Sequence, residues 1–193
     1  SVIDFTGLRV GVGPRAGTAG IYVPEIFKTL GISASIRYGA WEDMKSLTVA
    51  GELDAIALIG GVPLPALAAL DTIEPIDFIE LSSEQMAIIR KQMPELSPSV
   101  VPAGAYPSLI NDYNTIGLYN FAIVHKDLAD EIVYKIVKAV FENREELIKA
   151  QSSASETLPA NISRNTLLPV HPGAIRYYRE VGIAIPPGAI AAH

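Results

Sequence analysis

The chain has 193 residues, with 15 Lys and Arg against 21 Asp and Glu, which gives a formal net charge of −6 at pH 7. Hydrophobic residues make up 49% and charged residues 19%, a balance that predicts a folded chain with a sizeable core and excludes intrinsic disorder. An acidic chain without a basic run is unsuited to binding nucleic acid or anionic lipid. Cysteine is absent, which excludes disulfides and thiolate chemistry.

No segment has the pattern of a membrane span. The longest uncharged run, 55–70, contains two glycines and two prolines and is typical of a strand, a turn and a helix. Residues 1–10 lack the pattern of a signal peptide. The chain starts almost directly on a predicted strand, so we expect it to be a piece of a longer protein.

The first half of the chain alternates between strand and helix patterns. The predicted strands are short apolar runs at 8–13, 34–38, 54–59 and 76–81. The predicted helices follow them: one closed by Gly31, one over 41–50, one after the Gly60-Gly61 break, and one that begins with the capping box Ser82-x-x-Gln85. This order predicts an α/β fold with a mostly parallel sheet flanked by helices. The turns that lead from strand to helix then lie at one edge of the sheet, where ligands usually bind.

The second half differs in composition and in hydrophobic pattern. Residues 94–112 are rich in Pro, Ser, Gly and Tyr without a helical period, and 115–124 is predicted to be one long strand. Asp127 is expected to cap a long helix, with Asp130 in the capping-box position and an apolar stripe that runs to Phe141. A polar loop over 151–164, a short helix over 172–181 and a frayed tail over 185–193 complete the chain.

A glycine-rich turn follows the first predicted strand. Its sequence is Gly13-Pro14-Arg15-Ala16-Gly17-Thr18. Backbone N–H groups at a helix start attract anions, Thr18 can cap the helix, and Arg15 adds a bidentate donor for a carboxylate. The pattern predicts an anion cradle at Arg15, Ala16, Gly17 and Thr18; the alternative is a tight turn with an exposed arginine. Pro24 predicts a kink in the helix or a later start.

The same glycines resemble a loose dinucleotide fingerprint, Gly11-x-Gly13-x-x-x-Gly17. The next predicted strand ends in Arg37-Tyr38, without the acidic residue that would hold a ribose. Tyr134-x-x-x-Lys138 has the spacing of a dehydrogenase dyad, but a helix produces that spacing easily. A nucleotide-binding enzyme is therefore the weaker alternative.

A second candidate loop, Gly60-Gly61-Val62-Pro63, ends the apolar strand and leads into a helix. Its N–H groups should face the same edge of the sheet as the first loop, so the two loops would share one cleft; an ordinary turn is the alternative. Tyr38, Trp41 and Tyr106 are candidates to line that cleft, with core packing as the alternative, and Tyr106 is counted among the ligand-binding candidates.

The sequence contains no recognisable catalytic or metal-binding pattern. The chain has three histidines, His125, His171 and His193, and none has the spacing of a metal ligand. No nucleophile and base can be paired, and no G-x-S-x-G elbow occurs. We therefore expect no enzyme activity, no catalytic residue, no metal and no cofactor.

Five stretches resemble one family in order and spacing. The first is Leu8-Arg9-Val10-Gly11-Val12-Gly13-Pro14-Arg15-Ala16-Gly17-Thr18, which resembles the start of the second lobe in TAXI-type solute-binding proteins of TRAP transporters. The other four are Asp54-Ala55 with Gly60-Gly61-Val62-Pro63, then Pro94-Glu95-Leu96-Ser97-Pro98 with Pro102-Ala103-Gly104-Ala105-Tyr106, then Asn120-Phe121-Ala122-Ile123 with Lys126-Asp127-Leu128, and His171-Pro172-Gly173-Ala174 with Arg176-Tyr177-Tyr178-Arg179-Glu180.

The resemblance implies a type II periplasmic-binding-protein fold, in which two α/β lobes close on a small ligand. It implies that residues 7–115 form lobe two and that 116–193 are a C-terminal helical segment that returns to lobe one. The signal peptide and the first part of lobe one would be missing from this chain. Many family members carry Gly-Ser-Gly-Thr where this chain has Arg15-Ala16-Gly17-Thr18, so a hydroxyl is lost and a guanidinium gained.

The function implied is that of a periplasmic or other extracytoplasmic subunit that captures a small carboxylate or an amino acid, such as a glutamate-like ligand. It would deliver the ligand to a membrane permease, its only link to the membrane. Two other functions stay open: the nucleotide-cofactor enzyme using the loop 11–18, and an interaction protein without a small ligand.

Overall fold

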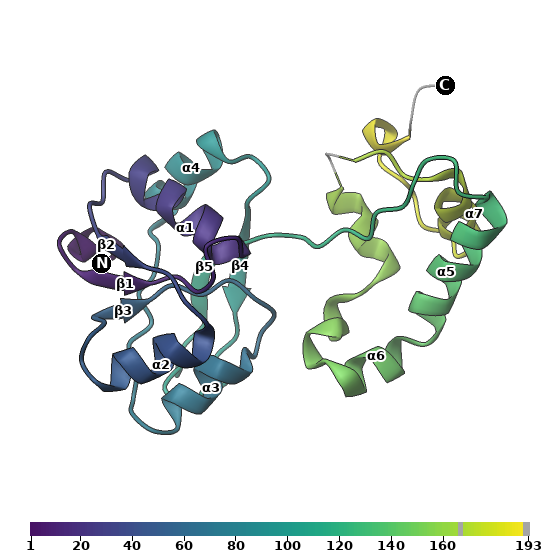
Figure 1. Ribbon diagram of the computed structural model, residues 1–193. Helices are drawn as coiled ribbons and strands as arrows, with labels where there is room; N and C mark the ends of the chain where they lie inside the picture. Colours follow the sequence, from purple (N-terminus) through teal and green to yellow (C-terminus); the bar gives the residue numbers. More distant parts are fainter. Residues whose placement is uncertain (166–167, 191–193) are drawn as a thin grey trace. The chain divides into compact units, whose positions relative to one another are not determined.

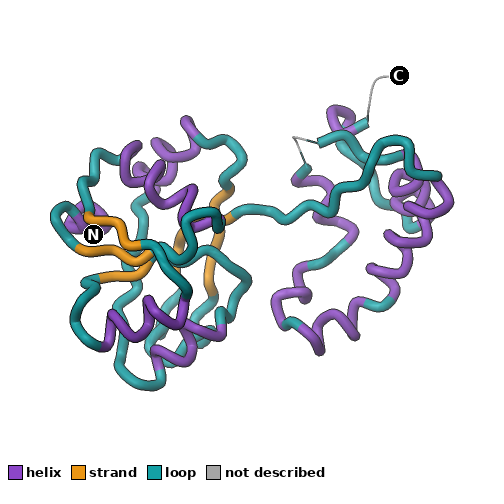
Figure 2. Tube along the Cα trace, viewed as in Figure 1, coloured by secondary structure: helices purple, strands orange, loops and turns teal. Residues whose placement is uncertain are grey.

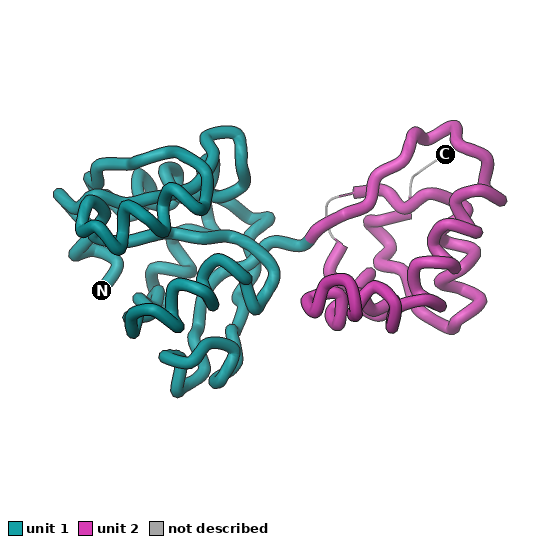
Figure 3. Tube along the Cα trace, turned by 60° about the horizontal axis from the view of Figure 1, so that its bottom comes forward, with its two compact units in different colours: residues 1–119 teal, residues 120–193 magenta. Residues whose placement is uncertain are grey.

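A three-stranded parallel sheet forms the centre of the first half of the chain (Figures 1 and 2). The computed structural model describes residues 1–165 and 168–190. It divides the chain into two compact units, Ser1–Tyr119 and Asn120–His193, which Figure 3 shows in different colours. Within the described residues, no helix is both long enough and apolar enough to cross a bilayer.

The strands of the sheet lie in the order β2-β1-β3. They are β1 (Arg9–Gly11), β2 (Ser35–Arg37) and β3 (Ala55–Ile56), and Val10 of β1 is paired with Ile36 on one side and Ala55 on the other. Helices α1 (Thr18–Thr29) and α4 (Ser83–Gln92) cover one face, and α2 (Trp41–Val49) and α3 (Pro65–Asp71) cover the other (Figure 1). This arrangement confirms the predicted α/β class with a parallel sheet flanked by helices.

The core of this unit forms where β1 is covered on both faces. Val10 and Val12 are fully buried, and Phe27 of α1 and Ile89 of α4 pack in the same cluster. Burial on both faces explains why Val10 and Val12 are apolar, whereas Arg9 at the start of the strand is exposed.

Several predicted helix ends are confirmed. Ser82 and Gln85 form a reciprocal capping box at the start of α4. Gly31 adopts a positive φ of 71° just after α1. Its N–H donates to the carbonyl of Lys28, and the N–H of Ile32 donates to the carbonyl of Phe27.

The start of α1 differs from the prediction in one respect. Gly17 is the N-cap residue and Thr18 is the first helical residue, so Thr18 does not cap the helix. The helix begins at Thr18 in spite of Pro24, which lies inside it. Burial of Val23, Ile26 and Phe27 stabilises this helix and outweighs the hydrogen bond that proline cannot donate.

Two strand predictions were wrong. Residues 76–81 do not form a strand; they are held in part by a side chain, because the hydroxyl of Tyr113 donates to the carbonyl of Ile79 at 2.9 Å. In place of the long strand predicted over 115–124, the structure has β5 (Tyr113–Gly117), whose last residue is paired with Ser97, the first residue of its antiparallel partner β4 (Ser97–Val101). The sequence pattern missed β4 because Pro98 and two serines interrupt its apolar residues. The third predicted strand, over 54–59, is shorter than expected, since β3 covers only Ala55–Ile56.

The second unit is helical in its described part. Helix α5 (Asp130–Glu142) packs against α7 (Pro172–Glu180), and Val133, Ala174 and Tyr178 form the buried centre of this contact. Helix α6 (Arg144–Ala150) follows α5. Short 3-10 helices occupy Ser152–Glu156, Pro159–Arg164 and Pro187–Ala189, and another, Val2–Phe5, begins the first unit.

Three predictions for this unit need correction. The long helix begins at Asp130 after the N-cap Ala129, rather than after Asp127, whose carboxylate is bound by the neighbouring Lys126 at 2.7 Å. The loop predicted over 151–164 contains two of the 3-10 helices. The tail is not frayed as far as Ile190, which pairs with Val170; residues 191–193, and with them His193, lie outside the described residues.

Candidate functional site

The two predicted loops follow neighbouring strands at the carboxyl edge of the sheet. The first, 12–17, follows β1 and leads into α1; the second, 57–64, follows β3 and leads into α3. These helices lie on opposite faces of the sheet, so the chain leaves the two strand ends in opposite directions (Figure 1). Such a point of reversal is where ligands bind in open α/β sheets.

The first loop is held by its own backbone. The N–H of Gly17 donates to the carbonyl of Pro14 at 2.9 Å, so it is already used within the loop. Gly20 packs directly on this turn, since a Cβ at that position would lie 2.3 Å from the oxygen of Pro14. The N-cap Gly17 offers no side chain to α1, which leaves the first-turn N–H groups without a side-chain cap.

Arg15, Ala16 and Thr18 are exposed in this loop, and Gly17 is half-buried. The guanidinium carbon of Arg15 lies 3.9 Å from the centre of the Tyr38 ring. Within the described residues, no carboxylate forms an ion pair with Arg15. A cation at the edge of the sheet is therefore held in place but not neutralised.

The second loop is exposed at Gly60, Gly61 and Pro63, and Val62 is half-buried. The Val62–Pro63 peptide bond is cis. Leu64 folds back over Gly60, where a Cβ would lie 2.2 Å from the Leu64 Cδ1. The loop thus presents backbone rather than side chains at its glycines.

Tyr106 supports the second loop from inside the protein. Its side chain is 3% exposed and stacks on Phe78 with 5.5 Å between the ring centres, so core packing, the alternative weighed from the sequence, is what the structure shows for this ring. Its hydroxyl accepts a hydrogen bond from the N–H of Leu64 at 2.8 Å. Burial raises the pKa of Tyr106 and keeps the phenol protonated at neutral pH, although the bond from Leu64 acts in the opposite direction.

A buried carboxylate that the sequence analysis missed fixes the segment after Tyr106. Asp71, at the end of α3, accepts hydrogen bonds from the hydroxyl of Ser108 and from its N–H, the latter at 2.8 Å. Burial opposes ionisation of Asp71, but the hydrogen bonds from Ser108 and Ile76 outweigh it and lower the pKa. Nothing in the spacing of Asp71 and Ser108 signals this contact, because 37 residues separate them.

The dinucleotide alternative is not favoured by the geometry at Gly13. The ring of Trp41 lies over this glycine, and a Cβ there would be 2.5 Å from the indole carbon Cζ2. In dinucleotide-binding turns the second glycine allows the pyrophosphate to approach the backbone. Here an aromatic side chain of this chain fills the corresponding space.

The pair Tyr134 and Lys138 belongs to a network between α5 and α7. Glu180 accepts hydrogen bonds from the Tyr134 hydroxyl at 2.5 Å and from the Lys138 ammonium at 2.8 Å. The hydrogen bond that Lys138 donates to Glu180, and then the one that it donates to Tyr134, raise the pKa of Lys138, which therefore stays charged. A lysine held in this state is unsuited to accept or relay a proton at neutral pH.

The remaining candidates lie elsewhere. His125 is exposed, and Nδ1 of His171 accepts a hydrogen bond from the N–H of Gly173 at the start of α7. In the part of the chain that the structure describes, no group of three His, Asp or Glu residues is placed to hold a metal ion.

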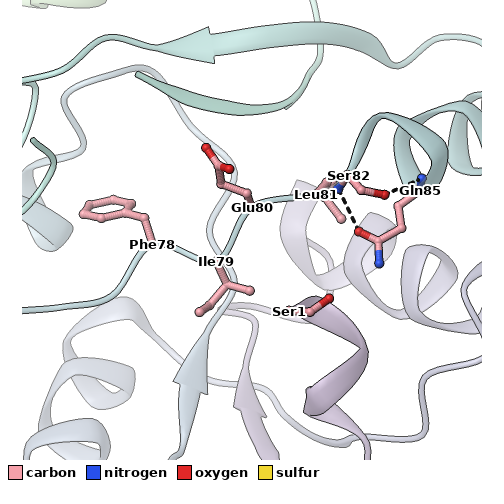
Figure 4. Close-up of a pocket in the computed structure, with 7 residues that line it drawn as sticks. All are labelled: Ser1, Phe78, Ile79, Glu80, Leu81, Ser82 and Gln85. Atoms are coloured by element: carbon pink, nitrogen blue, oxygen red, sulfur yellow. Dashed lines mark hydrogen bonds between the residues drawn. The ribbon is translucent and has the colours of Figure 1, made fainter. Parts of the chain in front are cut away.

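Two pockets on the surface of the first unit are lined by residues outside the two loops. One of about 390 Å³ lies between Ser1, the segment 78–82 and Gln85, next to the capping box of α4 (Figure 4). The other, about 740 Å³, is a groove between α1 and α4.

A comparison with protein families gives a match that extends through both units. The model of the NMT1-like family matches residues 1–182. This family belongs to the periplasmic-binding-protein-like group, which also includes the TAXI proteins. It is generally a family of binding proteins, typically extracytoplasmic. With a match over most of its length and a parallel sheet flanked by helices, the chain belongs to the NMT1-like family.

Proposed function

We propose that this chain is an extracytoplasmic solute-binding subunit that captures a small carboxylate or amino acid, such as a glutamate-like ligand. In this proposal it delivers the ligand to the membrane permease of a TRAP transporter, as TAXI proteins do. The proposal includes the type II class of binding-protein fold and capture by lobe closure. Residues 7–115 are then lobe two, and residues 116–193 belong to lobe one.

The observation that carries the proposal is the unneutralised Arg15 at the edge of the sheet where the chain leaves β1 and β3 towards opposite faces. The other arginine of β1 and its loop, Arg9, is bound by the Asp54 carboxylate at 2.6 Å. Arg15 lies in the loop between β1 and α1, where its guanidinium lies over the ring of Tyr38 and forms no ion pair with a described carboxylate. A small anion bound at this edge supplies the negative charge that would neutralise Arg15.

A carboxylate fits this environment for two reasons. A guanidinium binds a carboxylate through two parallel N–H bonds, which fixes the orientation of the ligand as well as its charge. The first-turn N–H groups of α1, Thr18 to Gly20, have no acceptor within the helix and add a positive field at the same place. The second loop, Gly60 to Pro63, offers exposed backbone on the neighbouring strand end.

The experiment is a thermal-shift assay followed by calorimetry with L-glutamate. A ligand that binds only the folded chain raises the midpoint of unfolding. We expect a shift with L-glutamate or with another small carboxylate in a panel, and none with NAD or NADP. The proposal is contradicted if only a nucleotide raises the unfolding temperature, or if no compound of the panel raises it.

Replacement of Arg15 tests its part in that function. We expect Arg15→Ala to weaken binding of the carboxylate by about 1.5–3 kcal/mol, the usual contribution of hydrogen bonds to a charged group. Arg179→Ala, which removes an exposed arginine of α7, is the control for the change in net charge. An equal affinity of wild type and Arg15→Ala would remove Arg15 from the site.

A further inference from the structure

Arg15 and Arg176 each lie over a tyrosine ring, and among the described residues a carboxylate neutralises Arg176 but not Arg15. The guanidinium carbon of Arg176 lies 3.8 Å from the centre of the Tyr134 ring, and its Nη1 donates to the Glu131 carboxylate at 2.8 Å. The guanidinium carbon of Arg15 lies 3.9 Å from the centre of the Tyr38 ring. Within the described residues, no carboxylate binds Arg15 as Glu131 binds Arg176.

The contact at Arg176 shows what the two groups do together. An aromatic face attracts the guanidinium but does not use its N–H donors, which remain free for an anion. Arg176 therefore binds Glu131 while it lies over Tyr134. Arg15 has the aromatic face without the anion.

The backbone fixes Tyr38 beside Arg15. The N–H of Val12 donates to the carbonyl of Arg37 at 3.0 Å, and the N–H of Gly39 donates to the carbonyl of Gly13 at 3.1 Å. These two bonds join the loop after β1 to the last residue of β2 and to Gly39, the residues on either side of Tyr38. The half-buried Tyr38 ring is thus held by the sheet itself, while Arg15 is an exposed side chain on a turn.

We propose that Tyr38 is a positioning residue that holds the Arg15 guanidinium ready for a ligand carboxylate, in the same arrangement that Tyr134, Arg176 and Glu131 form within the chain. This inference rests on the proposed function, and it deepens it by naming the residue that orients Arg15 towards the ligand carboxylate. Without Tyr38, Arg15 would have to be ordered by the ligand, and the lost rotamer freedom would reduce affinity.

The test compares Tyr38→Leu with Tyr38→Phe in calorimetry with L-glutamate. A cation–π contact at an exposed site corresponds to about a two- to fivefold change in affinity. We expect Tyr38→Leu to raise the Kd by about this factor and Tyr38→Phe, which keeps the aromatic face, to leave it near the wild-type value. In an Arg15→Gln background, Tyr38→Leu should have no further effect, because the residue on which it acts is gone.

A second measurement does not depend on any ligand. The ring of Tyr38 should shift the Nε–H resonance of Arg15 in the NMR spectrum upfield; the shift should persist in Tyr38→Phe and disappear in Tyr38→Leu. Absence of the shift in the wild type overturns the inference even if L-glutamate binds. Binding of L-glutamate that depends on Arg15 but is equal in wild type and Tyr38→Leu also overturns it and leaves the proposed function intact. If the resonance is shifted but no carboxylate binds, it is the proposed function that fails, and with it the role of Tyr38 towards a ligand.

Discussion

The hydroxyl oxygen of Tyr106 accepts a hydrogen bond from the N–H of Leu64 at 2.8 Å, and the two residues are 42 positions apart in the sequence. Tyr106 lies in the segment between β4 and β5, and Leu64 ends the loop that contains Gly60 and Pro63. The bond thus sets the second candidate loop by means of a buried side chain. It makes the shape of that loop depend on a part of the chain far from it in sequence.

Tyr106→Phe tests this support. The variant keeps the buried ring but leaves the Leu64 N–H without its acceptor, and an unsatisfied group of this kind costs about 1–3 kcal/mol of unfolding free energy. Urea denaturation measures the change. Tyr22→Phe is the control, since the hydroxyl of Tyr22 donates to a Glu95 carboxylate at 3.0 Å that water can solvate instead. An equal loss of unfolding free energy in Tyr106→Phe and Tyr22→Phe would show that the bond to Leu64 contributes no more than an exposed hydrogen bond.

Gly20→Ala distinguishes helix propensity from packing. In an exposed helix interior, alanine is more favourable than glycine by about 0.5–1 kcal/mol. At Gly20 the added Cβ would lie 2.3 Å from the Pro14 oxygen and 2.8 Å from the Arg15 oxygen, so the loop must move. We expect a loss of about 1–3 kcal/mol, as for an overpacked core, together with weaker binding of L-glutamate.

The control for that variant is Ala87→Gly on the exposed side of α4, which measures propensity alone. A stabilised Gly20→Ala protein would contradict the close contact between α1 and the loop.

Gly173→Ala probes the contact between α5 and α7. A Cβ at Gly173 would lie 2.2 Å from the carbonyl oxygen of Asp130 and 3.0 Å from its carbon, both in the backbone of the facing helix. Backbone cannot move aside as a flexible side chain can, so we expect the second unit to lose about 1–3 kcal/mol or more. Helical circular dichroism during thermal unfolding reports the change. Gly188→Ala, with open space around the added Cβ, should be close to neutral.

The ion pair between Arg9 and Asp54 should make stability depend on pH. Asp54 accepts hydrogen bonds from the side chain of Arg9 at 2.9 and 2.6 Å and from its N–H at 2.8 Å. The side-chain bond first, and then the backbone bond, lower the pKa of Asp54 from 3.8 to about 2. Because the folded pKa lies below the unfolded one, the stabilisation is complete above pH 4 and is lost as the pH falls through about 2.

Thermal unfolding of Asp54→Asn between pH 7 and pH 2 measures this contribution. The variant should unfold at a lower temperature than the wild type at pH 7, and the difference should vanish towards pH 2. Asp77→Asn is the control, since Asp77 is exposed and forms no ion pair among the described residues. A difference that stays constant over the whole range would show that Asp54 does not act through its charge.

The sequence predicted elements well where the signal was local. The capping box of Ser82 and Gln85 and the glycine after α1 each act within a few residues, and both are found in the structure. The prediction failed for β4 and for residues 76–81. Pairing with a distant strand decides whether such segments become strands, and their own pattern does not contain that information.

The candidate site, too, could be predicted from the sequence only in its local features. The sequence by itself determined that two glycine-rich turns follow apolar strands, because strand, glycine and helix signals are written in consecutive residues. Only the tertiary structure decided that β1 lies between β2 and β3, which brings the two turns to neighbouring strand ends and Tyr38 against Arg15. The physical reason is that strand order and side-chain contacts depend on burial summed over the whole core, to which each short segment contributes only a part.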